Sequence, residues 1–357
     1  MFQFLISDSN LWVLFTSLGL CGIVILYYGM KLSLTTETFA EKKKISSSWL
    51  GLTVLAMITS MPELTVVLTS SIMGKPELGV GDIFGACQMN LIIIVLLDAL
   101  QGSGAFSYQL RLTHILPASM SILIIGLAIL GIVVTSITGT SFIGFIVLPL
   151  MLLAYIYGNR LIYKVEQLSE EGFDKEEDIG AIIETDTELL MKIILYGILI
   201  SSAGALASLL ANDLSVYPFM ISGKTFILGG SFVGVLFLGF ITALPEFAVS
   251  FSAMKLGAVD MAVSNILGSI AFNVTLLIVM QLTTTKGIFL LLLQAQNGIS
   301  ILIPAVGVII MIAIVMMGLI YRSQKSFLQM GLDSFAVLLI YILTMWLFFE
   351  YSVHIAH

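Results

Sequence analysis

The sequence predicts an all-α membrane protein with ten transmembrane helices, arranged as two inverted five-helix repeats. Three observations support this prediction. Of the 357 residues, 59% are hydrophobic and only 10% are charged. The hydrophobic residues gather in runs of about 20, the length that a helix needs to cross a bilayer. A stretch of the first half recurs in the second half, and the chain crosses the membrane an odd number of times between equivalent positions.

Ten apolar runs are long enough to span a membrane, five on each side of an acidic segment. They lie at 10–31, 47–73, 79–101, 113–134, 139–159, 190–211, 226–254, 259–281, 297–320 and 330–350. The first run has no basic stretch before it and no small-residue cleavage site, so we expect a retained span and not a signal peptide. The expected division is a first five-helix repeat over 1–164, an acidic loop over 165–188 and a second repeat over 189–357.

The basic residues give the expected orientation. With the N-terminus outside, only Lys75, Lys224 and Lys286 of the 15 lysines and arginines lie outside, and basic residues favour the cytoplasmic side. This places the acidic loop, which holds most of the excess negative charge, in the cytoplasm. We expect a multi-pass protein of the cell (inner) membrane whose partners are lipid and ions. The charge pattern indicates no nucleic acid and no protein partner.

The internal repeat appears when the chain is shifted by 183 positions. Residues 51–97 then align with 234–280 without a gap, and Pro117 aligns with Pro304 at a shift of 187. Identities fall at Gly51, Leu55, Ile58, Thr59, Pro62, Glu63, Val66, Gly74, Val80, Ile83, Gly85 and Asn90. Because five crossings separate equivalent positions, the second copy enters the membrane from the opposite face. Inverted repeats of this kind are typical of secondary transporters.

Each copy carries a carboxylate inside an apolar run, Glu63 in the first and Glu246 in the second. A charge at the centre of a membrane costs a few kcal/mol or more, so intramembrane acids indicate function. The preceding Pro62 and Pro245 are expected to loosen the turns at 56–59 and 239–242 and to begin new half-helices. Each carboxylate would then lie in a first turn, where the helix dipole favours it.

These residues are suited to binding a hard cation. Ca²⁺ takes six to eight oxygen ligands, and the two glutamates with the carbonyls of Thr59 and Thr242 supply about six of them. Asn90 and Asn273, each 27 residues after its glutamate, add amide oxygens. Once the ion leaves, two facing carboxylates need protons or other cations. The empty carrier therefore resists crossing, and antiport is the expected function.

The same segments resemble the α-repeats of the Ca²⁺/cation antiporter superfamily, in particular its sodium/calcium exchanger branch. The resemblance rests on 59–63 and 242–246, which are similar to the branch's T-S-x-P-E, and on the G-x-x-x-x-N of the following spans. It implies that the glutamates bind Ca²⁺ and share Na⁺ sites completed by threonines, small-residue carbonyls and a serine. The positions it assigns are Glu63, Glu246, Thr59, Thr242, Ser60, Asn90, Asn273, Ser269 and the carbonyls of Ala56 and Gly239.

The coupling ion is open at this point. Exchange of Ca²⁺ for Na⁺ is the first hypothesis, and exchange of Ca²⁺ for H⁺ on the same scaffold is the alternative. Ala86 stands where the family has a serine that serves one Na⁺ site, which favours H⁺. The residues before Glu63 lack the G-N-x-x-E of the proton-coupled branch, which favours Na⁺. Asp82, near the start of its span, is expected to be either an ion-attracting vestibule residue or a solvated acid at the helix end.

Two other classes are less consistent with the sequence. Acidic rings in channels normally arise from oligomeric symmetry and not from an internal inverted pair. An intramembrane hydrolase would need a nucleophile or a water-activating set, and none is recognisable, so we expect no enzyme and no cofactor. Cys21 and Cys87 both lie in apolar runs, so neither a disulfide framework nor a zinc site is expected.

Overall fold

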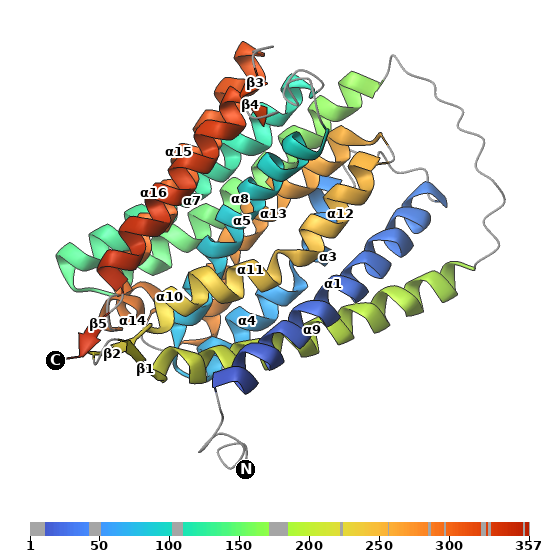
Figure 1. Cartoon of the computed structure of the whole chain (residues 1–357). Helices are drawn as coiled ribbons and strands as arrows, with labels where there is room; N and C mark the ends of the chain where they lie inside the picture. The colour runs from blue at the N-terminus through green and yellow to red at the C-terminus, as the bar shows by residue number, and fades with distance from the viewer. Residues whose placement is uncertain are drawn as a thin grey trace.

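The computed structural model describes residues 11–42, 51–101, 110–170, 185–221, 224–255, 257–284, 287–295, 298–322, 326–327, 330–352 and 354–356. The chain folds into a bundle of long helices (Figure 1). Within the described ranges, nine helical segments are long and apolar enough to cross a membrane. They are Leu11–Thr36, Pro76–Gln101, Leu112–Thr138, Phe142–Val165, Asp186–Val216, Gly230–Lys255, Val259–Thr283, Gly298–Tyr321 and Leu332–Ser352.

The remaining expected span, 47–73, is described from Gly51 onward and consists of three short pieces. In chain order the first half contains α1 (Leu11–Lys42), the π-helix η2 (Gly51–Leu55), α3 (Ala56–Thr59), α4 (Met61–Ile72), α5 (Pro76–Gln101), the 3₁₀-helix η3 (Leu112–His114), α7 (Ile115–Thr138) and α8 (Phe142–Glu170). Most of the expected acidic loop, 171–184, lies outside the described residues.

The second half repeats the order of the long helices. It contains α9 (Asp186–Val216), α10 (Gly230–Val233), the π-helix η4 (Gly234–Leu238), α11 (Gly239–Thr242), α12 (Leu244–Lys255), α13 (Val259–Thr283), α14 (Ile288–Gln294), the 3₁₀-helix η5 (Gly298–Ile301), α15 (Leu302–Tyr321) and α16 (Leu332–Ser352). Helix α14 and the five short strands of this half were not expected. Strands β1 (Pro218–Ile221), β2 (Lys224–Ile227) and β5 (His354–Ala356) form one antiparallel sheet, and β3 (Ser326–Phe327) pairs with β4 (Met330–Gly331).

The starting points of equivalent helices repeat the shift that the sequence gives. Residue 51 begins η2 and 234 begins η4, 56 begins α3 and 239 begins α11, and 61 begins α4 and 244 begins α12, each 183 apart. Helices α7 and α15 begin at 115 and 302, which is 187 apart. Pro117 and Pro304 therefore lie in first turns, where the missing N–H breaks no helical hydrogen bond.

Contacts between the halves also recur when the halves are exchanged. A Cβ added at Gly85 of α5 would lie 2.2 Å from the carbonyl oxygen of Val235, and one at Gly268 of α13 would lie 2.2 Å from that of Leu52. These two contacts are related by the 183-residue shift, and both require glycine. The packing of α5 against Val235 in one half thus recurs as the packing of α13 against Leu52 in the other.

Helices α1 and α9, the first helices of the two halves, lie side by side (Figure 1). The rings of Tyr28 and Tyr196 are 5.8 Å apart, and Lys42 Nζ lies 2.9 Å from Asp186 Oδ1. Residue numbers rise along α1 as they fall along α9, so the two helices are antiparallel. An inverted pair of repeats requires this relation between equivalent helices.

Buried polar residues lie inside the bundle among apolar ones, and many large apolar side chains are exposed on its outside. Helices α5 and α13 are the most deeply buried of the long helices. Exposed apolar side chains cover the outer helices and include Trp12, Phe145, Leu153 and Trp346. This distribution suits a bundle surrounded by lipid, because lipid tails solvate apolar surface.

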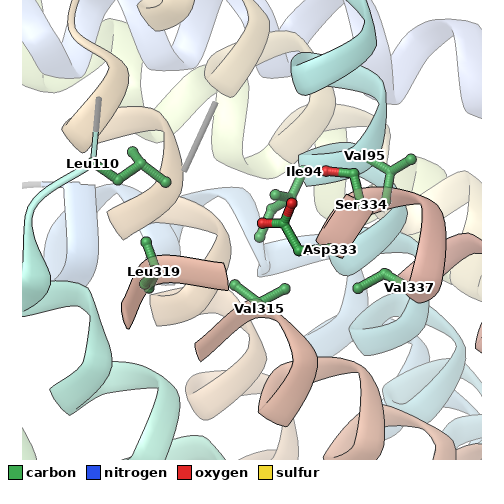
Figure 2. A pocket seen from close by; sticks show the side chains of 8 residues that line it. All are labelled: Ile94, Val95, Leu110, Val315, Leu319, Asp333, Ser334 and Val337. Atoms are coloured by element: carbon green, nitrogen blue, oxygen red, sulfur yellow. The ribbon is translucent and has the colours of Figure 1, made fainter. Parts of the chain in front are cut away.

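A small pocket lies between α5, α15 and the start of α16 (Figure 2). Its lining is mainly apolar, with Asp333 and Ser334 supplying the polar atoms. None of its lining residues is a candidate ion ligand, so this pocket is not part of the site described next.

Candidate functional site

Both central segments are broken at equivalent residues. α3 ends at Thr59 and α4 begins at Met61, while α11 ends at Thr242 and α12 begins at Leu244. Ser60 and Ala243 form the breaks, and Glu63 and Glu246 lie in the first turns of the new helices. The expected half-helices are therefore present. The π-helices before the breaks were not expected, and such turns are frequent at functional sites.

The two glutamates are fully buried, with no exposed surface on either side chain. Glu246 Oε1 accepts a hydrogen bond from Ser60 Oγ at 3.1 Å, and Thr59 and Ser269 are also its neighbours. Glu63 has Thr242 and Glu246 as neighbours. Each carboxylate is thus surrounded partly by residues of the opposite half, as an inverted pair of segments requires.

The contacts of Thr59 and Thr242 show which faces of α13 and α5 lie toward the helix breaks. Thr59 Oγ1 lies 3.4 Å from Ser269 Oγ of α13, and Thr242 Oγ1 donates to Asp82 Oδ1 of α5 at 2.9 Å. Residues four apart share a helix face. Asn273 follows Ser269 by four residues, so it lies on the face of α13 that meets Thr59.

On α5 the same spacing connects Asp82 with Asn90, eight residues further along. Both asparagines are fully buried. The carbonyls of Ala56 and Gly239 each accept a backbone hydrogen bond, from Ser60 N and Ala243 N. A carbonyl oxygen has two lone pairs, so that of Gly239 retains one for an ion. The Ala56 carbonyl oxygen also accepts from Thr59 Oγ1 at 3.3 Å, so an ion would have to displace that hydroxyl.

Several buried polar atoms of these residues have no hydrogen-bond partner. They are both carboxylate oxygens of Glu63, Oε2 of Glu246, Oδ2 of Asp82 and the side-chain amides of Asn90 and Asn273. An unpaired buried polar group costs about 1–3 kcal/mol, and a charged one costs more. Unpaired oxygen atoms in one region suit a hard cation, because binding the cation would stabilise them and offset this free-energy cost.

Within the described ranges, no group of three His, Cys, Asp or Glu side chains is arranged to hold a metal ion. A cation here must therefore draw on hydroxyl, amide and carbonyl oxygens in addition to carboxylates. The candidate residues supply all of these groups. Such a mixed oxygen set is typical of Ca²⁺ sites and does not resemble a zinc site.

One of the two predictions for Asp82, a solvated acid at the end of a helix, is wrong. Asp82 has no exposed surface and bonds Thr242, so it is not a solvated acid at a helix end. The reason is that α5 begins at Pro76, which places Asp82 almost two turns inside the bundle. The sequence signal for a buried acid was the position of Asp82 within an apolar run, where the second repeat has the neutral Asn265.

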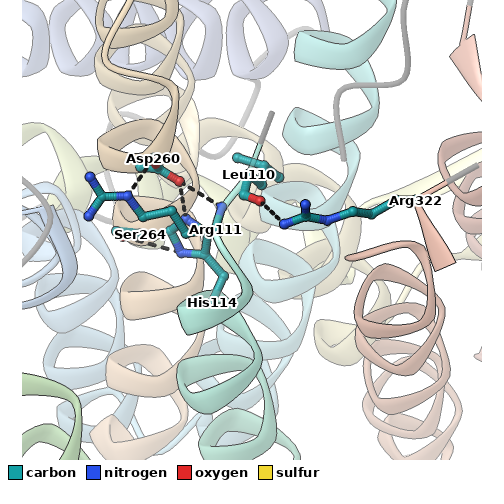
Figure 3. A network of polar contacts seen from close by, with 6 residues as sticks. All are labelled: Leu110, Arg111, His114, Asp260, Ser264 and Arg322. Carbon is teal, nitrogen blue, oxygen red and sulfur yellow. Dashed lines mark hydrogen bonds and ion pairs between the residues drawn. The ribbon is translucent and has the colours of Figure 1, made fainter. Parts of the chain in front are cut away.

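A separate polar network joins the start of α7 to the start of α13 (Figure 3). Asp260 Oδ1 lies 2.7 Å from His114 Nε2 and accepts from Arg111 N at 3.1 Å, while Oδ2 lies 3.3 Å from Arg111 Nε. Ser264 Oγ lies 3.5 Å from His114 Nδ1. Nearby, Arg322 donates to the carbonyl oxygen of Leu110 at 3.0 Å.

This network is expected to stabilise the fold. Replacing Asp260 by Asn removes the charge that Arg111 and His114 face, and should lower the free energy of unfolding by about 1–3 kcal/mol. Thermal unfolding of purified protein in detergent measures this. Glu77→Gln is the matched control, because Glu77 is the equivalent acid of the first repeat and forms no ion pair within the described ranges. Equal unfolding temperatures for both variants would contradict the stabilising role.

Comparison with known proteins identifies the family. The family model described as "Sodium/calcium exchanger protein" matches residues 9–160 and 189–350, which is most of the chain. The chain belongs to this family. It is an integral, multi-pass membrane protein and a cation/Ca²⁺ antiporter by family, and its family and fold are those of a transporter and not of an enzyme.

Three membrane proteins are similar to this chain over most of its length. It is 28% identical over 255 residues to the uncharacterized membrane protein MJ0091 of Methanocaldococcus jannaschii, covering 70% of this chain and 75% of that protein. It is 27% identical to the putative antiporter CaxA of Alkalimonas amylolytica, covering 71% and 76%. The inner membrane protein YrbG of Escherichia coli K12 is 23% identical, covering 77% and 81%.

Among solved structures, the fold matches the sodium-calcium exchanger NCX_Mj in crystals soaked with Na⁺ and Sr²⁺. The TM-score is 0.57 and the identity 20%, and the match covers 93% of this chain and 97% of that chain. The expected exchanger-like architecture is therefore confirmed at the level of the fold.

Proposed function

We propose that this exchanger moves Ca²⁺ out of the cytoplasm in exchange for Na⁺. The observation that carries the proposal is the pair of fully buried glutamates, Glu63 and Glu246, which retain three unpaired carboxylate oxygens. The described ion pairs do not include either of them. Buried carboxylates without a counter-charge need a bound cation or a proton.

The surrounding donors favour Ca²⁺ as that cation. Two carboxylates cancel its charge, and Thr59, Thr242, Asn90 and Asn273 with the carbonyls of Ala56 and Gly239 complete an oxygen set of the expected size. Ser60 and Ser269 hold Glu246 in place or contribute to a flanking Na⁺ site. Within the described ranges no lysine or arginine is in this set.

Exchange follows from the charge of the site. When Ca²⁺ leaves, the two carboxylates carry uncompensated charge in the membrane interior, so the empty carrier is costly to reorient. Na⁺ ions that replace Ca²⁺ restore neutrality and permit the return step. The inverted relation of the halves supports alternating access, because exchanging their conformations opens the site to the opposite side.

Exchange of Ca²⁺ for H⁺ is the second candidate. It is favoured by Ala86, which offers no hydroxyl at the position where the second repeat has Ser269.

Uptake of ⁴⁵Ca²⁺ into proteoliposomes tests the proposal. One set of vesicles is loaded with Na⁺ and diluted into Na⁺-free buffer, and a second set carries an outward H⁺ gradient at equal Na⁺. We expect uptake only with the Na⁺ gradient. Uptake driven only by H⁺ would replace Na⁺ by the second candidate, and uptake in neither arm would refute Ca²⁺ exchange.

A further inference from the structure

A third carboxylate lies beside the two glutamates. Asp82 has no exposed surface, its Oδ1 accepts from Thr242 Oγ1 at 2.9 Å, and its Oδ2 has no hydrogen-bond partner. Glu246 and Glu63 are both within electrostatic range of it. The candidate site therefore holds three acids, although the proposed Ca²⁺ site uses two.

The two halves differ at this point. The equivalents of Asp82 and Ala86 on α5 are Asn265 and Ser269 on α13, each 183 residues later. Thr59 meets the neutral Ser269, whereas its equivalent Thr242 meets the acid Asp82, one helical turn from the position of Ala86. The half that lacks the hydroxyl thus presents a carboxylate to the same threonine.

The charge of Asp82 is not balanced by the rest of the chain or by one Ca²⁺. The salt bridges Lys42–Asp186, Arg111–Asp260 and His114–Asp260 lie elsewhere and do not include Asp82. A Ca²⁺ on Glu63 and Glu246 cancels two negative charges and leaves the third. Within the described ranges, no group of three His, Cys, Asp or Glu side chains is arranged to hold one metal ion. A separate singly charged cation is the simplest balance, because an isolated buried charge is costly.

We propose that Asp82 binds a monovalent coupling cation together with Thr242. The Oδ2 of Asp82 is unpaired, and the Thr242 hydroxyl, which donates to Oδ1, keeps acceptor lone pairs. Under the proposed function, on which this assignment rests, the cation is Na⁺. Asp82 then takes the place of the serine hydroxyl that α13 supplies in the other half.

The test measures Na⁺ directly and in transport. Equilibrium binding of ²²Na⁺ to purified protein without Ca²⁺ gives the number and affinity of Na⁺ ions, and Na⁺-driven ⁴⁵Ca²⁺ uptake gives the Na⁺ concentration for half-maximal rate. The variants are Asp82→Asn and the double variant Asp82→Asn with Ala86→Ser, which copies Asn265 and Ser269 of the other half. Asp98→Asn is the matched control, since this buried acid on α5 bonds Gly331 N at 2.6 Å.

We expect Asp82→Asn to weaken Na⁺ binding and to raise the half-maximal Na⁺ concentration at least tenfold. The half-maximal Na⁺ concentration of the double variant should return to within about threefold of the wild-type value. Asp98→Asn should have the wild-type value. Asparagine can still accept the Thr242 hydrogen bond, so a purely structural Asp82 would leave Na⁺ affinity unchanged, and that result would overturn the assignment. Wild-type uptake driven only by H⁺ would overturn the choice of Na⁺.

The two proposals fail in different ways. If the wild type binds ²²Na⁺ in an Asp82-dependent manner but exchanges no Ca²⁺, the proposed function fails and Asp82 remains a Na⁺ ligand. If Na⁺ drives Ca²⁺ uptake equally in the wild type and in Asp82→Asn, the proposed function stands and the assignment of Asp82 fails.

Discussion

Glu63→Gln and Glu246→Gln are each expected to reduce Ca²⁺ exchange at least 100-fold, to the level of empty vesicles. Glutamine keeps the size of the side chain but removes one of the two charges that cancel Ca²⁺. The loaded site would then carry excess positive charge in the membrane interior, which costs several kcal/mol. A loss of about 2.7 kcal/mol in binding already corresponds to a hundredfold effect.

The measurement is ⁴⁵Ca²⁺ uptake into proteoliposomes at equal protein content. Glu350→Gln is the matched control, because Glu350 is an exposed acid at the end of α16. It should transport at the wild-type rate. If both site variants also transport at that rate while eluting as folded protein, the glutamate pair is not the ion site.

Gly85→Ala and Gly268→Ala are expected to have the largest effects on stability. In both positions a Cβ would lie 2.2 Å from a backbone carbonyl oxygen of the opposite half, at Val235 or Leu52. Neither contact can be relieved by rotating a side chain, so the crossing of the halves must open. Overpacking of this kind costs about 1–3 kcal/mol or more.

The controls for this pair are Gly126→Ala in α7 and Gly197→Ala in α9. An added Cβ meets nothing within 4 Å at either position. Alanine favours helix by about 1 kcal/mol over glycine, so these variants should be unchanged or more stable. Thermal unfolding in detergent and the yield of monodisperse protein measure both sets. Site and control variants that unfold together would refute the close crossing.

Much of the fold could be predicted because the membrane restricts the choices. Long apolar runs must be helices, and the shift of 183 residues is visible in identities such as Thr59, Pro62 and Glu63. The starts of α4 and α12 were also predicted, from Pro62 and Pro245. The short strands and α14 could not be predicted, because their segments carry no strong periodicity and pair only in the folded chain.

The candidate site was predicted in its residue types more than in its contacts. Burial of Glu63, Asn90 and their equivalents followed from polar residues within apolar runs. The bond from Thr242 to Asp82 could not be predicted, because it depends on where α5 crosses α11. The π-helices η2 and η4 were also missed, since one extra residue in a turn leaves no mark on composition.

The most direct measurement is the number of Ca²⁺ ions bound to the purified exchanger, by equilibrium dialysis with ⁴⁵Ca²⁺ in Na⁺-free detergent solution. We expect one Ca²⁺ per chain in the wild type and in Glu350→Gln, and none at the same Ca²⁺ concentration in Glu63→Gln or in Glu246→Gln. Loss in both site variants would mean that one ion is held jointly by the two halves. Undiminished binding in either site variant would contradict a shared site.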